Sequence, residues 1–100
     1  MIYFHGTSKY NLNKIINSGY IGIKYFDDNG VFLTPDFYHA CLFGDHILEI
    51  KLPINIKKID YKKNEEPEIY INSLIPIHRI VNIWRPEDIN TELIMKYLNY

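Results

Sequence analysis

Residues 31–44 join an extended run directly to the start of a helix, and this order constrains the fold more than any other feature. Val31–Leu33 is predicted to be a strand. Thr34 is the expected N-cap and Pro35 the first helical residue, while Asp36 suits the positive end of the helix dipole. Gly44 is expected to end the helix. We therefore predict a compact α+β fold.

A second helix is predicted near the N-terminus, in the segment SKYNLNKIINSGY. Leu12, Ile15 and Ile16 share one helical face, and Gly19 supplies a left-handed stop. Met1–Phe4 is expected to form a short strand before this helix. The fold thus has a helix directly after its first strand.

The rest of the chain alternates short apolar runs with turn residues. No repeats or linkers interrupt it, and the order of the strands does not follow from the sequence. The expected elements are a turn at 29–30, strands within 46–53, 54–61, 68–76 and 78–84, a charged loop at 62–67 and an amphipathic C-terminal helix within 86–100.

Length and composition set the limits on function. One hundred residues, 47% of them hydrophobic, suffice for a single domain spanning 1–100. A net charge of −1 gives no bulk attraction to a polyanion. The lone Cys41 excludes an internal disulfide and a cysteine-rich zinc site, and suits a reducing compartment. No apolar run is long enough to span a bilayer, so we expect a soluble, cytoplasmic protein without a membrane partner.

The stretch His5-Gly6-Thr7-Ser8 is the first candidate for a ligand site. It places a ring nitrogen, a bare backbone and two hydroxyls within a few ångströms at the end of a strand. The alternative is structural: a histidine with its hydrogen bonds satisfied, followed by a turn into a helix.

Three segments together resemble the ADP-ribosyltransferase fold in its H-Y-E branch, which includes the poly(ADP-ribose) polymerases and diphtheria toxin. FHGTS is similar to the His-Gly-Ser/Thr turn of that branch. GVFLTPDFYHACLF matches its spacing of two aromatics eleven positions apart, and EIYIN resembles the strand that begins with the catalytic glutamate. The matches occur in family order across residues 3–72. Phe32 and Phe43 stand where tyrosines are usual.

The resemblance implies a split, mixed or antiparallel β-sheet core and NAD as the substrate. His5 is then expected to be catalytic and to hydrogen-bond the adenosine ribose, while the Gly6 backbone pairs with the nicotinamide carboxamide. Thr7 or Ser8 would add a hydroxyl to the same network. No metal is implied, and His39, His46 and His78 are not at metal-ligand spacing in the sequence.

The aromatic segment is expected to hold the nicotinamide ring. Phe43 would stack on it and Phe32 would close its other side; an aromatic face contributes about 1 kcal/mol beyond burial even without a phenol. Ala40 lies where a small hydroxyl residue is common, so one carboxamide partner is missing. The alternative for both phenylalanines is ordinary core packing.

Glu68 is the residue expected to perform catalysis, because a carboxylate stabilises the oxocarbenium ion that forms when nicotinamide leaves. Glu65 and Glu66 in the preceding loop and Glu49 in a strand compete with it. The alternative is a charged residue at a strand edge.

The resulting functional hypothesis is a mono-ADP-ribosyltransferase that moves ADP-ribose from NAD to a macromolecule, a protein rather than a nucleic acid, in the manner of a toxin or a viral factor that modifies a host. Two alternatives stay open. One is a degenerate member of the fold that acts as a small protein-binding inhibitor, and the other is an RNA 2′-phosphotransferase.

Overall fold

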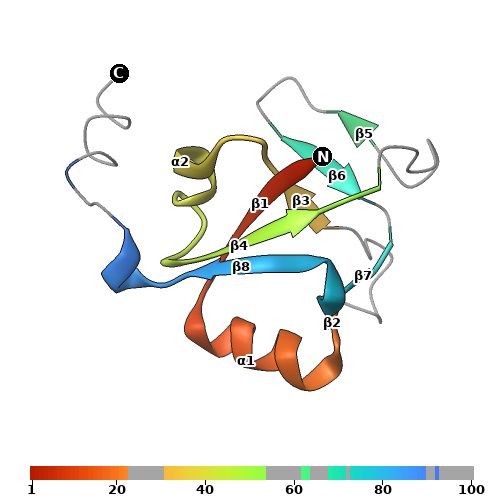
Figure 1. The fold of residues 1–100 in the computed structure, drawn as a ribbon, viewed down its shortest axis with the longest axis horizontal. Helices are drawn as coiled ribbons and strands as arrows, with labels where there is room; N and C mark the ends of the chain where they lie inside the picture. Colours follow the sequence, from red (N-terminus) through yellow and green to blue (C-terminus); the bar gives the residue numbers. More distant parts are fainter. Residues whose placement is uncertain (23–30, 54–61, 64–67, 72, 90–91, 93–100) are drawn as a thin grey trace.

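A computed structural model of the chain describes residues 1–22, 31–53, 62–63, 68–71, 73–89 and 92. Within them the fold is α+β, as predicted, with two short helices and antiparallel strand pairs (Figure 1). In chain order the elements are β1 (Ile2–Thr7), α1 (Lys9–Ser18), β2 (Tyr20–Ile21), β3 (Val31–Leu33), α2 (Phe37–Ala40), β4 (His46–Lys51), β5 (Lys62–Lys63), β6 (Ile69–Ile71), β7 (Ile75–Pro76), the 3-10 turn η2 (Ile77–Arg79), β8 (Ile80–Trp84) and the 3-10 turn η3 (Pro86–Asp88).

Among the described residues the strands form three small sheets, with orders β1-β4-β8, β3-β6-β5 and β2-β7. The first two touch at a single bridge, where Phe4 and Thr34 exchange backbone hydrogen bonds of 2.7 and 3.0 Å. Beyond this bridge β1 and β3 are not paired. The sheet is therefore split between these two strands.

The two helices pack on opposite faces of β1. Consecutive side chains of a strand point to opposite faces. Tyr3 is buried in the main core with Leu12 of α1, whereas the Phe4 ring meets the Phe37 ring of α2 edge to face at 5.6 Å. In Figure 1, α1 lies below β1 and α2 to its left. The core thus lies on the α1 side, and α2 covers the other face.

The first strand is longer than predicted. It runs to Thr7 rather than ending at Phe4, because His5, Gly6 and Thr7 continue the ladder with β4. The expected His-Gly-Thr turn is thus extended backbone. Ser8 begins α1 by accepting a hydrogen bond from the Asn11 N–H at 3.1 Å.

The end of α1 is as predicted, since Gly19 takes the left-handed conformation with φ 83°. Leu12 and Ile15 are buried on the helix face that packs on the sheet. Ile16 was predicted to share that face and is instead 49% exposed. Around the helix axis Leu12 lies between Ile15 and Ile16, so Ile16 falls at the edge of the packed face, on the side away from Ile15.

The start of α2 differs from the prediction. Thr34 is held in the bridge to Phe4, so it cannot be the N-cap. Asp36 caps the helix instead, with Oδ1 accepting from the backbone N–H of Tyr38 at 2.9 Å and of His39 at 3.4 Å. The Thr34 hydroxyl accepts from the Asp36 N–H at 3.1 Å and supports this cap.

The end of α2 also differs, because the helix stops at Ala40 and Gly44 does not terminate it. Phe43 therefore lies in the turn after the helix. A Cβ at Gly44 would lie 2.2 Å from the Thr7 carbonyl oxygen. Gly44 is needed for this close approach of two backbones rather than for a left-handed stop.

Some other predicted segments differ from the structure, and others cannot be compared because they lie outside the described residues. Lys62–Lys63 pairs with β6 instead of forming a loop, and residues 78–79 belong to η2 rather than to the strand that follows. The turn at 29–30, the strand at 54–61, and residues 90–91 and 93–100 of the expected C-terminal helix lie outside the described residues. The first residues of that expected helix form the 3-10 turn η3 instead. No helix within the described ranges is long and apolar enough to cross a membrane.

Candidate functional site

A cavity of about 1280 Å³ opens where β1 and β3 separate. It draws its walls from β1, α1, β3, the turn after α2 and the start of β6. Seven of the eight residues predicted for the site line it: His5, Gly6, Thr7, Phe32, Ala40, Phe43 and Glu68. Ser8 does not line it and serves as the N-cap of α1.

The backbone of Gly6 faces this opening. Along a strand in an antiparallel ladder, successive residues direct their N–H and C=O groups to opposite edges. Phe4 directs both groups to Thr34, on the β3 side. Gly6, two residues on, therefore presents its N–H and C=O at the same edge, where β3 has moved away. A planar amide entering the cavity could pair with both groups.

The absence of a side chain at Gly6 has a packing cause. A Cβ there would lie 2.0 Å from the Ala40 carbonyl oxygen and 3.2 Å from the Phe43 Cβ. Ala40 itself is completely buried. Glycine thus lets the end of α2 rest on β1, and this contact positions the turn that carries Phe43. From the sequence alone, this glycine is expected to allow the approach of a ligand, and its contact with α2 is not foreseen.

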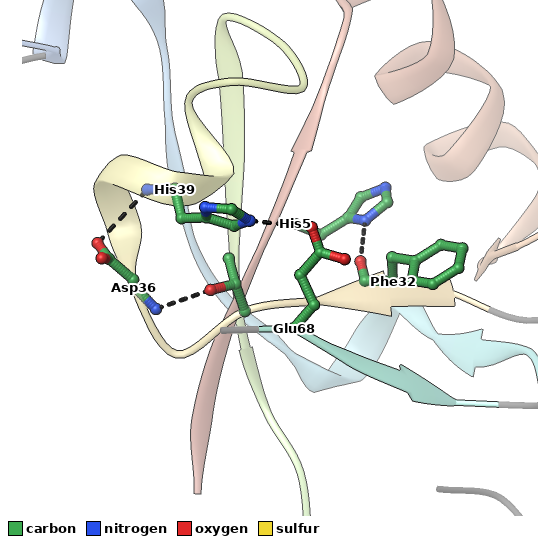
Figure 2. Close-up of polar contacts among 6 residues, drawn as sticks. His5, Phe32, Asp36, His39 and Glu68 are labelled. Atoms are coloured by element: carbon green, nitrogen blue, oxygen red, sulfur yellow. Dashed lines mark hydrogen bonds and ion pairs between the residues drawn. The ribbon is translucent and has the colours of Figure 1, made fainter. Parts of the chain in front are cut away.

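His5 spans the split from β1 to β3. Its Nδ1 lies 3.0 Å from the Phe32 carbonyl oxygen (Figure 2). Since a carbonyl only accepts hydrogen bonds, Nδ1 carries the hydrogen. Burial lowers the pKa of His5 from 6.5, and the bond to Phe32 offsets this only in part. The ring is therefore neutral near pH 7, and its Nε2 is a hydrogen-bond acceptor for a ligand hydroxyl.

Two exposed aromatic rings stand on the walls of the cavity. Phe32 is 55% and Phe43 58% exposed, so neither is an ordinary core residue. The Phe32 ring packs against Tyr70 of β6, with centroids 4.9 Å apart. The Phe43 ring meets His39 edge to face at 5.6 Å. Each ring is braced on one side and exposes apolar area on the other, as a platform for a flat ligand requires.

Glu68 enters the cavity from the residue before β6 and meets His39 of α2. The His39 Nε2 donates a hydrogen bond to Glu68 Oε1 at 2.9 Å. Figure 2 shows the carboxylate between His39 on one side and His5 with Phe32 on the other. His39 was not among the predicted site residues, because 29 residues separate it from Glu68 and only the tertiary fold brings the two side chains together.

Within the described residues, Glu68 is the only carboxylate that lines the cavity. Glu49 accepts a hydrogen bond from the Trp84 indole at 3.3 Å, and Asp36 is used as the cap of α2. Glu65 and Glu66 lie outside the described ranges. The described parts of the chain hold no group of three or more His, Cys, Asp or Glu side chains suited to a metal ion.

The other end of the cavity runs along α1. Asn11, Lys14 and Ser18 line it there, at helical spacings of three and four. Lys14 is the only lysine or arginine that lines the cavity within the described residues. One end therefore carries an acidic group between aromatic rings, and the other carries a cation.

No family model, curated protein or solved structure matches this chain.

Proposed function

We propose that this protein is a mono-ADP-ribosyltransferase that uses NAD as the donor of ADP-ribose and a macromolecule, a protein rather than a nucleic acid, as the acceptor. One observation carries the proposal. His5 and Gly6 of β1, the rings of Phe32 and Phe43, and the carboxylate of Glu68 come from distant segments and line one cavity at the split of the sheet. They supply a ring nitrogen that accepts a hydrogen bond from a ligand hydroxyl, a backbone that can pair with an amide, two aromatic faces and a negative charge.

These groups suit the nicotinamide riboside portion of NAD. The Gly6 N–H would donate to the carboxamide oxygen and the Gly6 C=O would accept from the carboxamide nitrogen. Phe43 and Phe32 would hold the ring by its faces. Outside that portion, the neutral His5 would accept a hydrogen bond at Nε2 from a hydroxyl of the adenosine ribose. Each contact orients the substrate without forming a covalent bond to it.

Glu68 would act on the bond that breaks. When the bond between ribose C1′ and the nicotinamide nitrogen breaks, its electron pair leaves with nicotinamide and the ribose becomes an oxocarbenium ion. A carboxylate about 4 Å away in a medium of effective dielectric near 20 attracts that charge by about 4 kcal/mol. The acceptor then bonds to C1′, and Glu68 takes the proton that the acceptor loses.

Glu68→Gln tests this role, because it keeps the shape and removes the charge. We expect turnover to fall roughly 100-fold while NAD binding stays close to that of the wild type. Glu49→Gln is the matched control, since Glu49 does not line the cavity. Equal turnover in wild type and Glu68→Gln would refute the assignment.

NAD binding is best followed by thermal unfolding. A hundredfold excess over the dissociation constant stabilises a protein by about 2.7 kcal/mol. The fluorescence of Trp84 is a poorer probe, because this side chain packs against Phe37 and does not line the cavity. Labelled NAD added with a cell lysate then identifies the acceptor as protein or nucleic acid. No stabilisation at millimolar NAD would instead support the small protein-binding inhibitor.

A further inference from the structure

His39 contacts two elements of the candidate site at once. Its Nε2 lies 2.9 Å from Glu68 Oε1, and its ring meets the Phe43 ring edge to face at 5.6 Å. Its own backbone N–H is held at 3.4 Å by the Asp36 cap of α2. One histidine thus connects the carboxylate of the β6 segment to the aromatic platform after α2.

The hydrogen bond between His39 and Glu68 also determines which carboxylate oxygen of Glu68 is engaged by the protein. An ionised carboxylate only accepts, so the hydrogen lies on His39 Nε2. The His39 and Glu68 side chains are 12% and 20% exposed, which shields the bond from competition by water. Among the described residues, His39 is the only one shown to hydrogen-bond the Glu68 carboxylate. This bond holds Oε1 and does not involve Oε2.

Free glutamate side chains rotate about three bonds, and fixing one costs conformational entropy on the order of 1 kcal/mol or more. A bond that holds the carboxylate before substrate binds removes part of this cost from the reaction. Contact with Phe43 extends the same restraint to the ring that would support nicotinamide. The pair therefore sets the distance between the platform and the negative charge.

Resting on the proposed function, we propose that His39 is a positioning residue that holds Glu68 Oε1 and the Phe43 ring, so that Glu68 Oε2 faces the ribose carbon at which nicotinamide is replaced. His39 itself contacts neither the ribose nor the acceptor. It acts through Glu68, and its loss is expected to reduce kcat far more than it raises KM for NAD.

The test compares His39→Ala with His39→Gln in ADP-ribosyl transfer from NAD. We expect His39→Ala to lower kcat on the order of 10- to 100-fold, as misplacement of a reacting group by about 1 Å does, with KM changed by less than about threefold. The glutamine amide retains an N–H donor, so His39→Gln should recover much of the lost kcat. His78→Gln is the control, because His78 is exposed and does not line the cavity.

Thermal unfolding of each unliganded variant separates positioning from folding. Comparable melting temperatures with unequal kcat in the alanine and glutamine variants would support the inference. Unchanged kcat in His39→Ala, or equal losses in both variants, would overturn it while leaving the proposed function intact. A wild-type protein that neither binds nor consumes NAD would overturn the proposed function, and this inference with it.

Discussion

Gly6→Ala is the substitution for which the structure gives the most direct expectation. The added Cβ would lie 2.0 Å from the Ala40 carbonyl oxygen, 3.0 Å from the Ala40 carbonyl carbon and 3.2 Å from the Phe43 Cβ. Reaching an ordinary contact of 3.4 Å requires the end of α2 and β1 to separate by about 1.4 Å. The two nearest atoms both belong to the Ala40 backbone, so no flexible side chain can absorb the shift.

Overpacking of this kind costs about 2 kcal/mol, which lowers the melting temperature of a 100-residue domain by roughly 8 to 16 °C. The same displacement moves Phe43 and His39 away from β1, so NAD binding should weaken as well. Thermal unfolding with and without NAD measures both effects. Gly19→Ala is the control, since nothing lies within 4 Å of its added Cβ. Its left-handed backbone predicts a loss of about 1 kcal/mol without any change in NAD binding.

A melting temperature for Gly6→Ala within about 2 °C of the wild type would refute this packing argument. If NAD binding were then lost in a stable protein, Gly6 would serve the approach of the ligand, as the sequence alone suggests. The two explanations for one glycine are thus separated by a single pair of measurements.

Two further predictions concern titratable groups. Burial lowers the pKa of His5 from 6.5, so the unfolded chain binds a proton at this residue more readily than the folded protein does. The stability of the wild type should therefore fall as the pH drops below about 6.5. The variant His5→Gln should lose this part of the dependence of melting temperature on pH. Burial and the negative charge of Asp36 raise the pKa of the Cys41 thiol, so iodoacetamide should alkylate it more slowly at pH 8 in the folded protein than in denatured protein. Equal rates would contradict this.

Local signals in the sequence predicted which helices and strands exist better than they predicted the first and last residues of each. The helix stop at Gly19 was predicted correctly because the signal is a property of one residue. The cap of α2 was placed at Thr34 because three polar or proline residues in a row all suit a helix start. The choice of Asp36 is made by the bridge between Thr34 and Phe4, a contact 30 residues apart in the chain. Tertiary pairing thus decides between caps that are equivalent locally.

The candidate site likewise has a part that the sequence predicted and a part that depends on tertiary contacts. The resemblance to the ADP-ribosyltransferase fold indicated which positions could meet a ligand, and seven of the eight line one cavity. The His39–Glu68 pair was not predictable, since it joins α2 to the residue before β6 and depends on the tertiary arrangement of these segments. Register between distant strands follows from pairing energies that a single sequence does not reveal. The roles of the residues in binding NAD remain predictions.

Position 32 carries a phenylalanine where the fold that the sequence resembles usually has tyrosine, and the structure shows which groups of this residue face the site. What position 32 contributes to the site is a backbone carbonyl, which accepts the hydrogen bond from His5, and an exposed aromatic face braced by Tyr70. Neither group requires a phenol hydroxyl. A phenylalanine at this position, where the ADP-ribosyltransferase fold that the sequence resembles usually has tyrosine, is therefore compatible with the orientation of His5 and is not by itself an argument that the site is degenerate.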